Sequence, residues 1–131
     1  MKNIFLILIA MFFIACNQQP KDKIEKALIE YYSEDRIHVY KTLDGTLELS
    51  EYTTKDYEFI DYNIVATINY ADVKTVYKIE HTYLVTEYNR VTKKSHKQYY
   101  TDVIKVEFEG DNSTVKDNTI WSVNGDLRYN Q

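Results

Sequence analysis

The sequence predicts an α+β domain in which one N-terminal amphipathic helix packs on an antiparallel β-meander. Two patterns carry this prediction. Apolar side chains first recur at helical spacing, and beyond residue 36 they alternate with polar ones, as on a half-buried strand. Turn sequences such as Asp44-Gly45 and Asn124-Gly125 separate alternating stretches, as hairpins require. A helix followed by hairpin-connected strands suits a sheet packed on, or wrapped around, that helix.

The predicted helix begins near Pro20, whose missing N–H costs nothing in the first turn of a helix. Its apolar stripe occupies positions i, i+3, i+4, i+7 and i+8, and consists of Ile24, Ala27, Leu28, Tyr31 and Tyr32. Lysines and acids alternate on the other side of the helix. We therefore interpret the stripe as a core face and not as the basic face of a membrane-surface helix.

Strands are expected at residues 37–43, 46–53, 60–70, 73–88, 98–108 and 119–123, with a short return through Leu127 and Tyr129. Residues 110–114 are expected to end the third long strand. If Ala71-Asp72 forms a two-residue turn, although this is a poor sequence for one, the apolar sides of the two longest strands share a face. The expected partners are Ala66 with Tyr77, Ile64 with Ile79, Tyr62 with His81, and Ile60 with Tyr83.

The element order is similar to that of cystatin-like and nuclear-transport-factor-like rolls, a resemblance that transfers no function. The alternative is a small β-barrel with the helix outside. It is suggested by apolar residues on the second sheet face, which make that face less polar than a solvated one should be. These residues are Val65, Val76, Leu84 and Val103.

The first sixteen residues are typical of an export leader. Lys2 precedes an uninterrupted apolar run, residues 4–14. At about 1.5 Å per residue, this run is too short to cross a hydrocarbon core of about 30 Å. It therefore indicates the apolar region of a signal peptide. The run ends in Phe13-Ile14-Ala15-Cys16, and Cys16 is the only cysteine of the chain.

This ending resembles the lipobox of bacterial lipoproteins, although Phe13 stands where leucine is usual. The resemblance implies cleavage before Cys16, attachment of a diacylglycerol to its sulfur and usually acylation of the new amino group by a fatty acid such as palmitate. Two or more acyl chains hold a protein stably on a membrane. We expect residues 1–15 to be a removed signal peptide, 16–20 the lipidated cysteine and a short tether, and 21–131 one domain. The alternative is an ordinary secretory peptide with Cys16 as a free thiol.

The composition limits the class of partner. The chain carries 20 acidic and 16 basic side chains, a net charge of −4 at pH 7, which argues against nucleic acid or anionic lipid headgroups. Thirteen Tyr against 3 Gly and 1 Pro indicate an ordered domain. Since Cys16 is assigned to the lipid, an apolar core has to stabilise the fold without disulfides.

The motifs of common enzyme and cofactor sites are missing from the sequence. No serine lies in a Gly-x-Ser-x-Gly elbow, and the three glycines are too far apart for a phosphate-binding loop. The histidines, His38, His81 and His96, are isolated, without metal-ligand spacing. We therefore expect no cofactor, no metal and no catalytic residue.

One group of residues is considered as a binding face, on the strand side that is predicted to carry His81. In the expected register His81 lies among tyrosines, so it could act as a proton-transfer group with Glu87 or Asp102 nearby. Separately, Glu87 and Asp102 could act as a carboxylate pair. We favour the interpretation that His81 is hydrogen-bonded to a tyrosine at the edge of the core. We interpret Glu87 and Asp102 as solvated charges near the predicted turn. The candidate binding face consists of Tyr62, Tyr77, His81 and Tyr83.

The predicted turn at residues 90–97 is basic. Its side chains could contact an acidic partner or an anionic glycan, but a short charge run at a hairpin tip usually keeps the tip soluble. The basic residues are Arg90, Lys93, Lys94 and Lys97.

Together these observations predict an exported, non-enzymatic lipoprotein of the bacterial envelope. It would be tethered through Cys16, on the periplasmic or outer surface, and would bind an envelope protein or glycan through its sheet. The alternative is a carrier of a small apolar ligand, which requires a cavity of about 300 Å³ or more between helix and sheet. A less favoured alternative is an enzyme that uses His81 as acid or base, which requires an accessible His81 beside a carboxylate.

Overall fold

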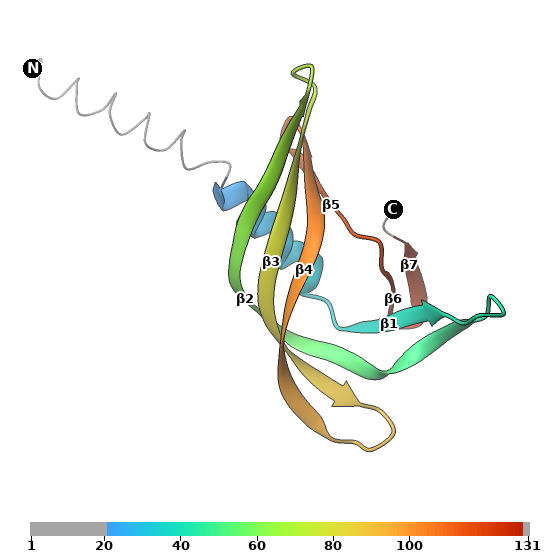
Figure 1. Ribbon diagram of the computed structural model, residues 1–131. Helices are drawn as coiled ribbons and strands as arrows, with labels where there is room; N and C mark the ends of the chain where they lie inside the picture. The colour runs from blue at the N-terminus through green and yellow to red at the C-terminus, as the bar shows by residue number, and fades with distance from the viewer. Residues whose placement is uncertain (1–20, 130–131) are drawn as a thin grey trace, which may run out of the picture.

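The structure, a computed structural model, describes residues 21–129. The leader, Cys16 and Pro20 lie outside the described residues. The described chain begins in a helix, residues 21–32, which lies across one face of a seven-stranded antiparallel sheet (Figure 1). Within the described part of the chain, no helix is long and apolar enough to cross a membrane.

The sheet has the strand order β5-β4-β3-β2-β1-β6-β7. Its first five strands form the predicted meander, and β6 then returns to pair with the free side of β1. The predicted combination of one helix with an antiparallel sheet is confirmed. The barrel alternative is wrong, because over the described residues the sheet is open, with β5 and β7 at its edges. The strands are β1 (Arg36–Lys41), β2 (Leu47–Tyr70), β3 (Lys74–Asn89), β4 (Ser95–Glu109), β5 (Asn112–Lys116), β6 (Ile120–Val123) and β7 (Asp126–Tyr129).

Two predicted boundaries are wrong. The stretches 46–53 and 60–70 are one continuous strand, β2, which runs beside β1, bends, and continues beside β3 (Figure 1). The expected break at 110–114 is a tight turn at Gly110 that leads directly into β5, which pairs with the end of β4. In contrast, Asn124 and Gly125 form the predicted hairpin turn, with φ angles of 51° and 86°.

The register between β2 and β3 agrees with the prediction at the centre only. Tyr62 pairs with His81 and Ile64 with Ile79, as expected. Toward the ends, however, Thr67 pairs with Tyr77 and Phe59 with Tyr83, so the expected partners Ala66 and Ile60 are wrong. The cause is three register shifts in β2, between Lys55 and Glu58, Phe59 and Asp61, and Ile64 and Ala66. Each bulge inserts extra residues on one strand and changes which side chains face the core.

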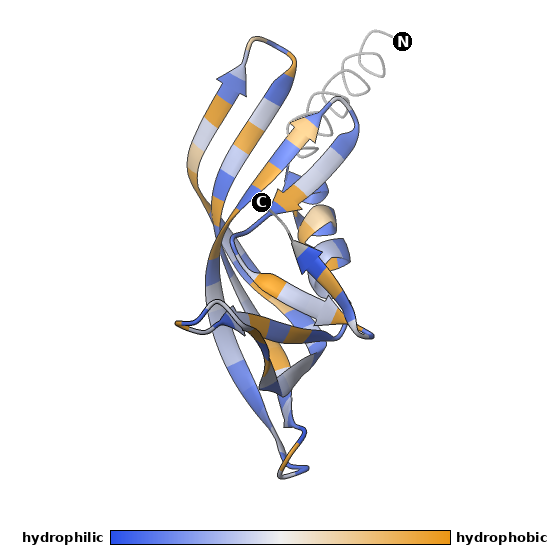
Figure 2. Cartoon of the chain, turned by 90° about the vertical axis from the view of Figure 1, so that its right-hand side faces the viewer, coloured by the Kyte–Doolittle hydropathy of each residue, from blue (hydrophilic) through white to orange (hydrophobic). Residues whose placement is uncertain are grey.

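The apolar stripe of β2 is therefore divided between the two sheet faces. Ile64 pairs with Ile79 on the helix side, whereas Ile68 pairs with Val76, whose side chain points to the opposite side. Figure 2 shows the alternation of apolar and polar residues along the long strands. The turn that follows has both central residues, Ala71 and Asp72, at positive φ, with angles of 44° and 59°. This left-handed backbone conformation has a higher conformational energy for these residues than for glycine, because they carry a Cβ atom.

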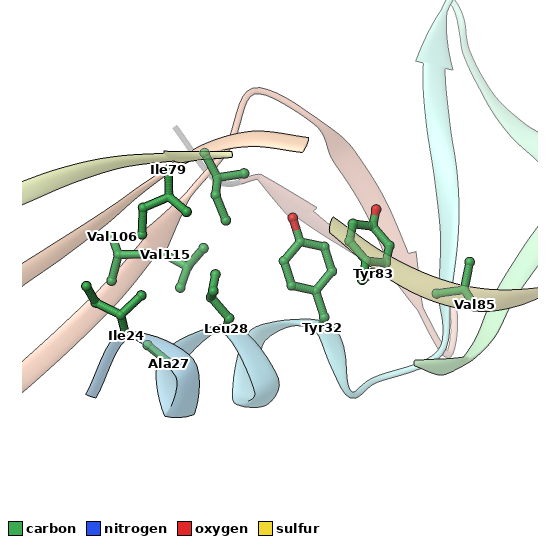
Figure 3. Close-up of a cluster of buried hydrophobic side chains, with 10 residues drawn as sticks. Ile24, Ala27, Leu28, Tyr32, Ile79, Tyr83, Val85, Val106 and Val115 are labelled. Atoms are coloured by element: carbon green, nitrogen blue, oxygen red, sulfur yellow. The ribbon is translucent and has the colours of Figure 1, made fainter. Parts of the chain in front are cut away.

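The core lies between the helix and the middle of the sheet. Ile24 and Leu28 are fully buried, and they pack with Ile79 and Val106, which are also fully buried (Figure 3). The C-terminal end of the helix contributes Tyr32 instead of an aliphatic residue. The core therefore changes from aliphatic to aromatic toward β1, and the cavity described next begins there.

Candidate functional site

A cavity of about 300 Å³ lies where the helix ends and the chain enters β1. Its wall is formed by the last residue of the helix, the following loop, β1, the bend of β2, the middle of β3 and β4, and the connection between β5 and β6. These segments come from the whole described chain. Only the curvature of the sheet brings them together, so no local sequence motif marks the site.

Asp102 on β4 is the central hydrogen-bond acceptor in the cavity wall. Its Oδ2 accepts hydrogen bonds from the hydroxyls of Tyr32 at 2.9 Å and Tyr83 at 2.7 Å. Both tyrosines are 6% exposed. Burial first, and then the negative charge of Asp102, raise the pKa of both tyrosine hydroxyls. These groups therefore remain protonated donors, and they hold the carboxylate at a fixed position on the wall.

Glu87 on β3 has a similar arrangement further along the sheet. It is 8% exposed, and its Oε1 accepts a hydrogen bond from the hydroxyl of Tyr100. Burial, followed by this hydrogen bond to Glu87, raises the pKa of Tyr100. Glu87 and Asp102 therefore each have tyrosine partners of their own, and no hydrogen bond joins the two acids in the described chain.

Arg36, the first residue of β1, is a buried cation in the cavity wall. It is 4% exposed, and its guanidinium carbon lies 4.0 Å from the ring centroids of both Tyr31 and Trp121. Such cation–π contacts stabilise a charge that has left water. Its Nε and Nη2 atoms are buried without a hydrogen-bond partner among the described residues. The guanidinium is thus stabilised mainly by aromatic faces.

His81 lies on the helix-facing side of β3 and is fully buried. Its Nδ1 lies 2.8 Å from the carbonyl oxygen of Asp61, which can only accept, so Nδ1 carries the proton. Its Nε2 then accepts a hydrogen bond from the Tyr57 hydroxyl, also at 2.8 Å. Burial lowers the pKa of His81. Both ring nitrogens are therefore used inside the fold, and neither bonds a carboxylate.

The other members of the candidate binding face also point toward the helix. Tyr83 is buried, and Tyr62 and Tyr77 are half-buried and pack against the core cluster. The Tyr62 hydroxyl reaches the carbonyl oxygen of Lys21 at 3.3 Å. These residues connect the sheet to the helix, and the exposed apolar side chains of the sheet lie elsewhere.

The predicted basic turn is shorter than expected, because β3 extends to Asn89 and β4 begins at Ser95. Arg90 ties the turn to the neighbouring strand: its Nη2 donates to the carbonyl oxygen of Ser50, and its backbone N–H to that of Glu51. Lys93, Lys94 and Lys97 are exposed.

Sequence reasoning named Asp102 but missed the residues that complete the cavity, chiefly Tyr32, Arg36 and Asp117. Asp117 accepts hydrogen bonds from the Tyr31 hydroxyl and from the backbone N–H of Thr119. Within residues 21–129, no group of three His, Cys, Asp or Glu side chains could hold a metal ion. Comparison with known proteins gives no significant match to this chain, whether to a family model, a curated protein or a solved structure.

Proposed function

We propose that this chain is an exported lipoprotein, anchored through Cys16 to a membrane of the bacterial envelope, whose domain binds another envelope component without catalysis. The lipobox-like segment at Cys16 supports the anchor and the location. A domain that follows its anchor within a few residues stays close to the lipid surface. The finer fold that we propose is a cystatin-like or nuclear-transport-factor-like roll, because a helix followed by an antiparallel meander is the element order of those rolls.

The observation that carries the binding role is a row of exposed apolar side chains along the unpaired edge of the second half of β2, on both faces of the strand. Ile60, Ile64, Val65 and Ile68 are each between 44% and 54% exposed. Beyond Thr54, β2 has no strand partner on its outer side among the described residues, since β1 pairs only as far as that residue. Apolar residues gathered on an unpaired edge are typical of interaction surfaces. We call these four residues the outer β2 surface.

Docking at the outer β2 surface would occur through side chains and not through an added strand. Three bulges interrupt this half of β2, and bulges twist an edge away from regular pairing. The partner would therefore place its own apolar groups against Val65 and Ile68.

A non-catalytic role is supported by the closed environment of His81. An acid or base must reach the proton that it transfers, whereas both nitrogens of His81 are used inside the fold. The carrier alternative is supported by the cavity of about 300 Å³. Its wall contains the carboxylates of Asp102 and Asp117, which favours a polar ligand over an apolar one.

The anchor is tested by metabolic labelling with an alkyne-bearing palmitate. The wild-type chain is expected to incorporate the label and to fractionate with membranes. The Cys16→Ala variant should lose the label and retain its leader, because cleavage of a lipoprotein leader follows lipid attachment. An unlabelled wild-type chain, or a labelled Cys16→Ala variant, would refute the anchor.

The outer β2 surface is tested by replacing Val65 with lysine, which adds a charge to the proposed contact. In cross-linked cell envelopes, Val65→Lys is expected to reduce capture of the partner at least about fivefold, since a buried unpaired charge strongly opposes association. Val91→Lys is the matched control, because Val91 is 70% exposed in the turn after β3. If both variants keep the wild-type cross-links, the outer β2 surface does not bind a partner.

A further inference from the structure

The tyrosines of the cavity present hydrogen-bond acceptors to its interior. A phenol has one proton, and each of these protons is already used. Tyr32 and Tyr83 both donate to Asp102. Tyr57 donates to His81. Tyr100 donates to Glu87, which does not line the cavity. The tyrosine oxygens that line the cavity can therefore only accept further hydrogen bonds.

The charged basic side chains of the wall, Arg36 and Lys55, lie against aromatic rings. The guanidinium carbon of Arg36 lies 4.0 Å from the ring centroids of Tyr31 and Trp121 and 5.0 Å from that of Tyr32, and its Nε and Nη2 are buried. The ammonium of Lys55 lies 5.1 Å from the ring centroid of Tyr88. Of these four rings, only that of Tyr32 lines the cavity. The wall includes five acidic side chains against Arg36, Lys55 and His38, and burial lowers the pKa of His38, which favours its neutral form.

Asp102 lacks a cationic partner although it is partly buried. It lines the cavity and is held by two tyrosine hydroxyls, but no basic side chain of the described chain lies within ion-pair distance of it. Its Oδ1 has no hydrogen-bond partner among these residues. A carboxylate that is removed from water is costly unless a cation compensates it.

We propose that the cavity binds a primary ammonium group, with Asp102 as its counter-ion and the hydroxyl oxygens of Tyr32 and Tyr83 as further acceptors. An ammonium has three N–H donors and accepts nothing, which matches a wall of acceptors. The volume is at the lower end for ligand pockets, so a single alkylamine fits better than a large ligand. A metal ion is not favoured, because the described residues lack a cluster of three ligands.

The ammonium could belong to a free alkylamine or to a lysine side chain of a protein, and the test distinguishes the two. The full chain, purified in detergent, is titrated calorimetrically with 1,5-diaminopentane and with Nα-acetyl-lysine N-methylamide. Binding with a Kd of about 1 mM or tighter is expected for at least one probe. Binding of the diamine alone indicates a free amine, and binding of the lysine derivative indicates a protein partner. Acetylation of the lysine Nε, which removes the charge, should abolish binding.

Asp102→Asn keeps the shape and an acceptor for both tyrosines but removes the charge. It is expected to weaken binding about tenfold to hundredfold, the usual value of a hydrogen bond to a charged group. Asp111→Asn is the matched control, because Asp111 is exposed, pairs with Lys23 at the surface, and does not line the cavity. Its affinity should stay within about twofold of wild type.

Tyr83→Phe provides a second variant, which removes one acceptor oxygen and keeps the ring. It should weaken binding about threefold to tenfold if Asp102→Asn fails to fold. The proposal is overturned if neither probe binds the wild-type chain, if acetylated lysine binds equally well, or if Asp102→Asn folds and retains full affinity. These outcomes are independent of the lipid anchor and of the outer β2 surface, so they leave the proposed function untouched.

Discussion

Replacing Leu28 with alanine is expected to lower the free energy of unfolding by about 2–5 kcal/mol. Leu28 is fully buried between the helix and the sheet, where it packs in one cluster with Ile79 and Val106 (Figure 3). The substitution removes apolar contacts and leaves a cavity in the only core of the described domain. Because small domains are stable by about 5–15 kcal/mol, the loss is a large fraction of the total. Denaturant titration followed by the fluorescence of Trp121 measures it.

Ile29→Ala is the control for this prediction, because it removes a side chain of similar size from the next position of the same helix. Ile29 is 40% exposed, so the expected loss is below about 1.5 kcal/mol. Equal losses for the two variants would show that the helix does not pack on the sheet through the Leu28 face.

Acidification is expected to destabilise the domain below about pH 6.5 through His81. Burial lowers the pKa of His81 in the folded state below its ordinary value of 6.5. Between these two pKa values the unfolded chain binds more protons, so the free energy of unfolding falls as the pH falls, by up to about 1.4 kcal/mol per pH unit. The stability is fully present above the unfolded pKa. Denaturant titrations at intervals between pH 7.5 and pH 5 measure the slope.

Two variants assign this slope to a residue. His81→Leu should flatten it, and should also lower stability at pH 7.5 by about 1–3 kcal/mol because the Tyr57 hydroxyl loses its acceptor. Burial also lowers the pKa of His38, so a double variant, His38→Gln with His96→Gln, which leaves His81 as the only histidine, should keep the part of the slope that belongs to His81. A flat profile in the double variant would mean that His81 does not carry the effect.

The fold could be predicted from the sequence where local pattern and turn chemistry decide the structure. The helical stripe predicted the buried residues Ile24 and Leu28, and Asn124-Gly125 predicted a hairpin turn. The register of β2 could be predicted only at Ile64 with Ile79 and at Tyr62 with His81. Beyond them it depends on bulges, and the residue in the last bulge, Val65, has the side chain of an ordinary strand residue. Periodicity cannot reveal such an insertion.

The cavity could not be predicted, because its residues meet only through the bend of the sheet. Tyr32 and Asp102 are 70 positions apart in the chain, and Tyr31 and Asp117 are 86 apart. Asp102 was expected beside Glu87 near a solvated turn, since both acids lie on neighbouring strands. The sequence contains no signal that two tyrosines would orient Asp102, or that Arg36 would leave solvent for a position between aromatic rings.

The return of β6 to the side of β1 has a consequence for the order of folding. All other strand pairs of the described sheet join neighbours along the chain, so each hairpin can close over a short loop. The pairing of Ile37 with Ser122 instead joins opposite ends of the domain. The contact of Trp121 with Arg36 therefore closes the longest loop between paired strands of the described sheet, and we expect it to form after the hairpins, so that β6 locks an already folded meander.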